Sequence, residues 1–253
     1  MIRRLSLSAG VSSAHGLRLL AVSDEADPAL DLDSNRTALG RIDAVVGAGD
    51  LEPDYLAFLA DAFHAPLLYV RGNHDRGENW DARRPHLPQP LTRDGDVVGP
   101  LRLVGLSWPG QKGGQAVRDE RAAWRQALGL WLRLRGSRPH IVLSHVPPRG
   151  VGDVPDDHYH RGFAAYRWLS RRLSPRLWIH GHTALSAVPR WREDWAGTTF
   201  VNATGAVLIE LGNGAAPTTA VDSWREQATG EGQQDAAHRP LRAQQRQLRR
   251  AET

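Results

Sequence analysis

The chain has 253 residues, a formal charge of +4 and no cysteine. This length suits one domain with a substantial core, or one domain and a tail, and the lack of cysteine excludes disulfides, thiolate metal sites and cysteine nucleophiles. The positive charge is almost all arginine, with Lys112 as the one lysine, and acidic residues are interleaved with it, so we interpret the surface as mixed and solvated and not as a nucleic-acid footprint.

Apolar periodicity predicts alternating strands and helices over the first 75 residues. We predict strands over residues 17–23, 42–49 and 67–70, and helices over 34–39 and 53–63. Ser34 and Gly40 bound the first helix, and Pro53 suits the first position of the second helix because its φ is already helical. Each strand is a continuous apolar run, which is typical of a parallel sheet that is covered on both faces.

A second series of elements follows a long loop, residues 76–100, that is rich in Pro, Gly and Arg and has room for a hairpin. We predict strands over 98–108, 140–144 and 176–181, a pair of closing strands within 199–211, and helices over 118–135 and 163–173. Trp124, Leu128, Trp131 and Leu132 share one face of the first of these helices. We interpret its tryptophans as core residues rather than as a stacking platform.

Composition sets the expected limits of the domain. We expect an N-terminal extension over residues 1–16, one domain over 17–212, and a poorly ordered tail over 213–253, where Gly, Ala, Gln, Thr and Arg dominate. The Arg-rich end of that tail could also become a helix on a partner or on an acidic surface. No apolar run approaches the roughly 20 residues of a membrane span and the Ser-rich start is not a convincing export signal, so we expect a soluble, cytoplasmic protein.

Five strands end in side chains that are able to bind a metal ion. They are Asp24, Asp50, Asn73, His145 and His182. In open α/β sheets, ligands bind beyond the carboxyl ends of the strands. Taken singly, each residue has a plainer interpretation, because an aspartate can cap a helix and a histidine can be a hydrogen-bonded loop residue. Together they form a mixed oxygen and nitrogen set that suits Mn, Fe or Zn, whereas an all-oxygen set would suggest Mg or Ca.

The order of these residues resembles that of the calcineurin-like metallophosphoesterase superfamily. The matching stretches are Asp24, GAGD (47–50), GNHD (72–75), SH (144–145) and HGH (180–182), spread over residues 17–211. The segment HRGF (160–163) and the SDE-type first motif are similar to those of one group of bacterial members. The resemblance implies a four-layer α/β/β/α fold and a phosphoesterase site for two metal ions.

The resemblance also implies how the metal ions are shared among these residues. Asp50 would bridge the two ions. Asn73, His145 and His182 would complete the second metal position, and Asp24 would belong to the first. Bound metals lower the pKa of water, hold a phosphate oxygen and support in-line attack at phosphorus.

The roles in catalysis and substrate binding are likewise expectations from the resemblance. His74 would be the catalytic histidine, which protonates the leaving oxygen or stabilises charge on the phosphoryl group. Asp75 could orient His74, since it is the next residue. Arg71, His160 and Arg161 are the candidate substrate-binding residues.

Two imidazoles of the family pattern are absent from this sequence. Ala26 stands where the first motif normally has a histidine, and Ala184 stands at the second histidine position of the last motif. Both missing ligands belong to the first metal position. We therefore expect one ion to bind tightly, at the second position, and the ion at the first position to bind weakly or not at all. The nearby candidates for replacement are Glu25, Asp27, His158, His160 and His180.

Three functions are consistent with these motifs. The first is a metal-dependent phosphoric ester hydrolase that acts on a small phosphorylated substrate, either a phosphomonoester or a phosphodiester, with nucleotides among the candidates. The second is a catalytically weak or inactive scaffold that binds a protein partner, like the superfamily member in the retromer coat. The third, a nuclease, would rest on the Arg-rich tail and the nine tryptophans, and neither forms a clear basic groove. We expect the first, without nucleic-acid or membrane partners.

Overall fold

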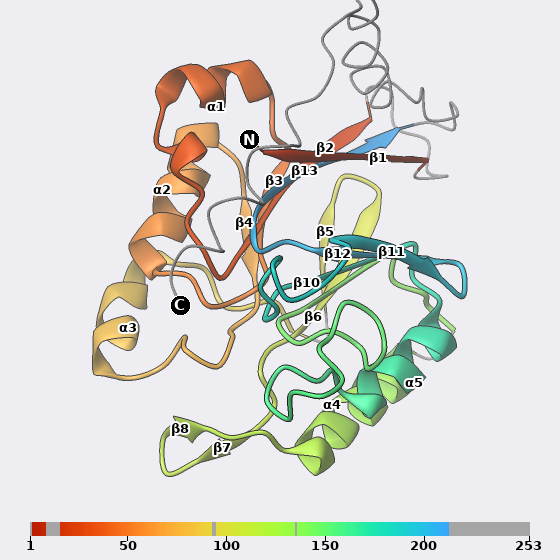
Figure 1. Ribbon diagram of the computed structural model, residues 1–253. Helices are drawn as coiled ribbons and strands as arrows, with labels where there is room; N and C mark the ends of the chain where they lie inside the picture. The colour runs from red at the N-terminus through yellow and green to blue at the C-terminus, as the bar shows by residue number, and fades with distance from the viewer. Residues whose placement is uncertain (1, 9–15, 93–94, 135, 213–253) are drawn as a thin grey trace, which may run out of the picture. The chain divides into compact units, whose positions relative to one another are not determined.

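Two β-sheets pack face to face, and helices cover the outer face of each (Figure 1). The computed structural model describes residues 2–8, 16–92, 95–134 and 136–212, with only the backbone of residue 79. The predicted tail, 213–253, lies outside the described residues. The layers confirm the expected α/β/β/α architecture. Across the described ranges, no helix is both long and apolar enough to span a membrane.

The first sheet has five strands and carries most of the N-terminal part of the chain. In spatial order its strands are β1 (Arg3–Ser8), β13 (Gly205–Gly212), β2 (Leu17–Ser23), β3 (Ala44–Gly47) and β4 (Leu67–Tyr69). The last three are parallel, and β13 runs antiparallel to β2. Its helices are η1 (Pro28–Leu30), α1 (Asp33–Leu39), α2 (Pro53–Phe63), α3 (Glu78–Arg83) and η2 (Arg84–His86). Side chains from η1, α1, α2 and α3 and from the sheet form one apolar core.

The second sheet has six strands and lies below the first in Figure 1. In spatial order its strands are β11 (Arg192–Trp195), β12 (Thr198–Asn202), β10 (Leu177–His180), β9 (Ile141–Ser144), β6 (Leu101–Leu106) and β5 (Asp96–Val98). Helices α4 (Glu120–Arg133) and α5 (Ala164–Leu173) cover its outer face. A small hairpin, β7 (Gln111–Lys112) and β8 (Gln115–Ala116), extends beyond them at the bottom of Figure 1.

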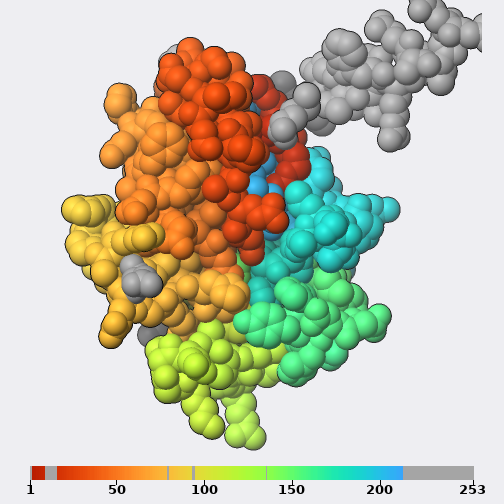
Figure 2. Space-filling model, turned by 60° about the vertical axis from the view of Figure 1, so that its left-hand side comes forward, coloured from red at the N-terminus to blue at the C-terminus, as the bar shows by residue number. Residues whose placement is uncertain are grey.

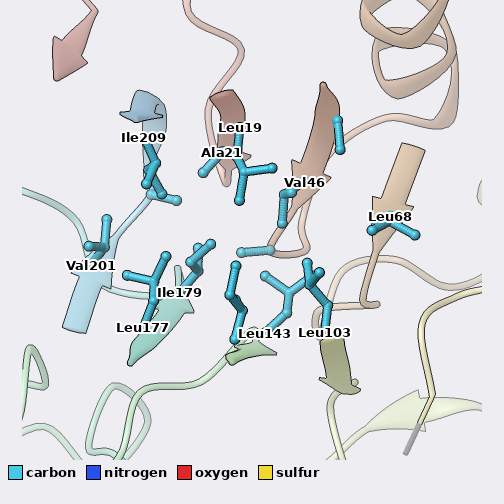
Figure 3. Packing of buried hydrophobic residues seen from close by; sticks show 14 of the residues in the cluster. Leu19, Ala21, Val46, Leu68, Leu103, Leu143, Leu177, Ile179, Val201 and Ile209 are labelled. Carbon is cyan, nitrogen blue, oxygen red and sulfur yellow. The ribbon is translucent and has the colours of Figure 1, made fainter. Parts of the chain in front are cut away.

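The continuous apolar runs of the sequence arise because each sheet is buried on both faces. In β2, Leu19 and Ala21 point into the core between the sheets, toward residues such as Ile179, as Figure 3 shows. Leu20 and Val22 alternate with them and pack under the helices. All four are fully buried, and burial of each larger side chain contributes about 1.5–3 kcal/mol. The continuous burial therefore agrees with the prediction of a sheet that is covered on both faces. Helices cover one face, and the other sheet covers the second face.

Several elements were not predicted, and the reason is clear for three of them. The expected extension contains β1, which pairs in parallel with β13. Only Leu5 of this edge strand is buried, so the apolar signal was weak. The loop over 76–100 contains α3, whose N-cap is Gly77 without a side-chain hydrogen bond, so no capping signal preceded it. The charged strand β11 was missed for the same lack of apolar residues.

The interpretation of the tryptophan-bearing face of α4 was wrong in part. Ala123, Ala127 and Leu130 are the fully buried residues of this helix, and Trp131 keeps 38% of its surface exposed. Trp124 is partly buried against the core. Ala123, Ala127 and Leu130 pack into the core under the second sheet, whereas Trp124 and Trp131 contact Trp168 of α5, with ring centroids 5.6 and 5.8 Å apart.

Candidate metal centre

The five strand-end residues predicted to bind metal lie together in one cleft region between the ends of the two sheets. Asp24, Asp50 and Asn73 follow β2, β3 and β4 of the first sheet, whereas His145 and His182 follow β9 and β10 of the second. An open cleft of about 330 Å³ is lined by Asp24, Asp50, Asn73, His74, Tyr159, His160 and His182. In Figure 2 the red and orange N-terminal part of the chain borders the cyan part around residue 190, so segments far apart in the sequence lie side by side.

Three candidate ligand atoms lie around Nε2 of His145, which is the fourth. Its Nε2 lies 3.0 Å from Asn73 Oδ1, 3.1 Å from Asp50 Oδ2 and 3.2 Å from His182 Nδ1. Metal–ligand bonds of about 2.0–2.2 Å place neighbouring ligand atoms about 3.0–3.4 Å apart in octahedral or tetrahedral sites. An oxygen of Asp24 also lies within 4.8 Å of ligand atoms of Asp50 and His145. The spacing and the donor types therefore fit a divalent transition-metal ion.

Both imidazoles of this group are held in the tautomer that a ligand needs. Nδ1–H of His145 donates to the carbonyl of Ala48 at 2.8 Å. Nε2–H of His182 donates to the carbonyl of Tyr159 at 3.1 Å. In each ring the other nitrogen, which faces the cluster, therefore keeps its lone pair for a metal.

Buried charges make the cluster favour one positive charge. Burial opposes protonation of His145, but the carboxylates of Asp50 and Asp24 outweigh it and raise the pKa of His145 to about 9. Burial likewise works against the charged form of Asp50, yet His145 holds the pKa of Asp50 below its ordinary value. Burial, and then the charge on His145, lowers the pKa of His182 to about 3. A divalent cation satisfies the same electrostatic demand as the proton on His145.

The backbone adopts a left-handed conformation at three of the cluster residues. The φ angles are 59° at Asp24, 57° at Asp50 and 71° at His182. Such conformations are uncommon for residues other than glycine, and they concentrate at functional sites. The other described non-glycine residues with positive φ are His64, Ser174 and Ala196, at two helix ends and a hairpin turn.

A hydrogen bond ties the two sheets together at the cluster. The backbone N–H of His182 donates to the carboxylate of Asp24, with distances of 2.9 and 3.1 Å to its oxygens. The hydroxyl of Thr204 donates to the same carboxylate at 3.3 Å. Asp24 is thus oriented by the strand ends around it, and its carboxylate keeps lone pairs for a metal.

Close backbone approach explains two glycines in the motifs. A Cβ atom at Gly72 would lie 2.1 Å from Asp50 Oδ1, and one at Gly181 would lie 1.9 Å from Ser23 Oγ and 2.3 Å from Asp24 Oδ2. Side chains at these positions would displace the carboxylates that face the cleft. The GNHD and HGH stretches therefore require glycine for steric reasons.

We expect Gly72→Ala to lower the free energy of unfolding by about 1–3 kcal/mol, the usual cost of overpacking, and to weaken metal binding because Asp50 must move. Gly212→Ala is the matched control, since its Cβ would meet no atom within 4 Å. Chemical denaturation and Mn²⁺ titration of both variants measure the two effects. Wild-type stability together with wild-type Mn²⁺ affinity in Gly72→Ala would contradict the steric argument.

Asp75 has a different contact from the one expected. Its Oδ2 accepts hydrogen bonds from the backbone N–H of Gly72 at 2.7 Å and of Asp50 at 2.8 Å. The part of the chain that the structure describes gives no hydrogen bond between this carboxylate and the ring of His74. Burial raises the pKa of Asp75 to about 6. Asp75 therefore orients the loops that carry Asp50 and Asn73, not the imidazole of His74.

Of the three candidate substrate-binding residues, only His160 lines the cleft. The guanidinium of Arg71 donates to the carbonyl of Asp75 and, at 3.0 Å, to Asp81 Oδ1, so it braces the following loop. Arg161 does not line the cleft. The substrate role predicted for Arg71 and Arg161 thus has no support from their positions.

Two aromatic residues of the site were not predicted. Tyr159 lines the cleft. The ring of Trp108 lies 5.4 Å from that of His182, 5.9 Å from that of Tyr159 and 6.3 Å from that of His145, measured between centroids. These rings shield the metal-facing imidazoles from one side. One sequence signal could have identified Trp108. It is the last residue of the predicted strand 98–108, and the metal-binding candidates likewise stand at the ends of predicted strands.

Comparison with known proteins gives a family and a set of similar folds. The family model described as calcineurin-like phosphoesterase matches residues 32–185. Among solved structures, the protein TT1561 of Thermus thermophilus is 16% identical, with a TM-score of 0.51 over 75% of this chain and 90% of that one. GAP50 of Plasmodium is 13% identical, with a TM-score of 0.46 over 75% and 72%. Vps29 of Entamoeba histolytica complexed with Zn²⁺ is 16% identical, with a TM-score of 0.37 over 79% and 81%.

At these identities a structural likeness bears on the fold alone. A search of the curated proteins gave no match. The family model covers more than half of the chain and includes Asp50, Asn73, His145 and His182. The chain therefore belongs to the calcineurin-like phosphoesterase family.

Proposed function

We propose that this protein is a metal-dependent phosphoesterase that hydrolyses a small phosphomonoester or phosphodiester, nucleotides included. The observation that carries the proposal is the convergence of Asp50, Asn73 and His182 on Nε2 of His145, at 3.0–3.2 Å. Membership of the family supports hydrolase chemistry at this cluster. The mixed oxygen and nitrogen donors favour Mn, Fe or Zn.

The side chains divide between two metal positions. Asp50, Asn73, His145 and His182 would hold an ion at the second position, and Asp24 with the shared Asp50 would contribute to the first. A bound divalent ion supplies Lewis-acid stabilisation of phosphoryl oxygens and lowers the pKa of water.

We assign protonation of the leaving oxygen to His74. Its side chain is exposed at the cleft, while its backbone N–H donates to Asp50 Oδ1 at 2.7 Å. In hydrolysis, the oxygen of water bonds to phosphorus and the ester P–O bond breaks. The protonated imidazole of His74 gives its proton to the leaving oxygen, and the proton released by water restores it through the solvent. His74 thus acts as a general acid.

A protein-binding scaffold is the second candidate function, and two observations favour it. Ala26 and Ala184 are exposed and offer no ligand to the first metal position. In addition, Leu128, Trp131 and Leu132 of α4 keep 40%, 38% and 47% of their surfaces exposed, which forms an apolar patch.

A phosphoesterase assay with metal analysis separates the two candidates. We expect metal-stripped protein to hydrolyse p-nitrophenyl phosphate or bis(p-nitrophenyl) phosphate after addition of Mn²⁺, Ni²⁺, Zn²⁺ or Mg²⁺, and EDTA to abolish the activity. His145→Ala, purified identically, measures any contaminating phosphatase. Turnover no higher than that of His145→Ala with every metal would contradict the proposed enzyme and favour the scaffold.

A further inference from the structure

The structure separates the five candidates for replacing the missing imidazoles. Glu25 and His158 are exposed and do not line the cleft. The carboxylate of Asp27 accepts the N–H of Ala29 at 2.9 Å and caps η1. His180 is 1% exposed and does not line the cleft either. His160 alone among the five lines the cleft together with the two carboxylates of the first metal position, and it lies outside the group of Asp24, Asp50 and His145 whose ligand atoms are within 4.8 Å of one another.

One nitrogen of His160 is already engaged by a carboxylate. Nδ1–H of His160 donates to Asp157 Oδ2 at 2.5 Å, and its ring lies 5.1 Å from that of His182. The hydrogen bond from His160 is the main reason that the pKa of Asp157 is lowered to about 2. Within the described ranges, Nε2 of His160 has no hydrogen-bond partner, so its lone pair is available.

The same arrangement occurs at the two imidazoles of the second metal position. His145 donates to the carbonyl of Ala48 and His182 to that of Tyr159, and each presents its other nitrogen to the cluster. Metal-binding histidines characteristically donate their second nitrogen to a carboxylate or carbonyl, which fixes the ring and its tautomer. His74, the proposed general acid, has no such partner among the described residues.

The loop that carries His160 is held in place by several hydrogen bonds. The carboxylate of Asp153 accepts from the N–H of Gly150 at 2.9 Å and of Gly162 at 2.8 Å. The guanidinium of Arg118, whose side chain is only 7% exposed, donates to the carbonyls of Tyr159 at 3.3 Å and Gly162 at 3.1 Å. Such a tethered loop can present an imidazole without a large loss of entropy on binding.

We propose that His160, oriented by Asp157, is the imidazole ligand of the first metal position and joins Asp24 and Asp50 there. This inference rests on the proposed function only in taking the cluster to be a metal site for divalent ions such as Mn²⁺. The imidazole comes from the loop before α5 and takes the place of those absent at Ala26 and Ala184. With two carboxylates and one imidazole, the first position remains weaker than the second.

The test measures binding of Mn²⁺ alone to the full, metal-stripped chain. Titration calorimetry of the wild type is expected to show two ions per chain, one tight and one weaker, and electron paramagnetic resonance to show a spin-coupled pair. His160→Ala and His160→Gln should weaken only the weaker site by about 10–100-fold or more, the range found when even a supporting partner of a metal ligand is removed. The coupled signal should then be lost. His158→Ala, which removes an exposed imidazole outside the cleft, should match the wild type.

A rescue distinguishes ligation from support of the loop. Ala26→His with Ala184→His, placed in the His160→Ala chain, should restore the weaker site because the new imidazoles supply what the loop has lost. Unchanged Mn²⁺ binding in both His160 variants, or only one ion in the wild type, would overturn the proposal. Failure of hydrolysis with two bound ions would instead overturn the proposed function and leave the ligand assignment intact.

Discussion

Asp50→Asn is expected to weaken metal binding at both positions and to lower kcat/KM by at least about 10³-fold. The carboxylate of Asp50 is the ligand that the two positions share, with Oδ2 3.1 Å from His145 Nε2. The substitution removes its charge but keeps an oxygen that can accept the N–H of His74, so the loop geometry is preserved. Metal ions supply several kcal/mol of transition-state stabilisation, and about 4 kcal/mol corresponds to the stated loss.

Calorimetry with Mn²⁺ and steady-state kinetics check this prediction. Asp31→Asn is the control, because Asp31 is an exposed aspartate that does not line the cleft. Two ions bound to Asp50→Asn with wild-type affinity would show that this carboxylate is not shared between metal positions.

His74→Ala should keep the metal content of the wild type and lose about 10²–10⁴-fold in kcat, the usual contribution of a general acid. The backbone N–H of His74 donates to Asp50 Oδ1, and the substitution retains that hydrogen bond. If the imidazole protonates the leaving oxygen, the loss should be larger for an alkyl ester than for a p-nitrophenyl ester, whose leaving group needs little protonation.

Kinetics with both esters, alongside metal analysis, measure this difference. His86→Ala removes a histidine that does not line the cleft and should leave turnover unchanged. Near-normal turnover of the alkyl ester by His74→Ala would remove His74 from the catalytic machinery.

The sequence was informative about the metal cluster because strand ends are a local signal. A continuous apolar run that stops at Asp50 or Asn73 can be read without knowing the fold, and these residues do meet. The partition of the strands between two sheets could not be deduced from such runs. The chain passes from the first sheet to the second between β4 and β5, and it returns to the first at the turn at Ala203 and Thr204, between β12 and β13.

Side-chain direction was the information that sequence adjacency could not provide. Asp75 follows His74, yet its carboxylate turns back to the N–H groups of Gly72 and Asp50. Arg71 precedes the same motif, and its guanidinium donates a hydrogen bond to the carbonyl of Asp75. Because these side chains lie in a tight polar turn, neither strand nor helix periodicity applies, and their roles follow only from three-dimensional contacts.

Anomalous diffraction from crystals soaked in Mn²⁺ tests most directly whether the cluster binds metal. The predicted result is a strong Mn peak in contact with Asp50 Oδ2, Asn73 Oδ1, His145 Nε2 and His182 Nδ1, and a weaker peak beside Asp24. No Mn peak in contact with these four atoms at a saturating concentration would contradict a metal centre at the ends of the two sheets.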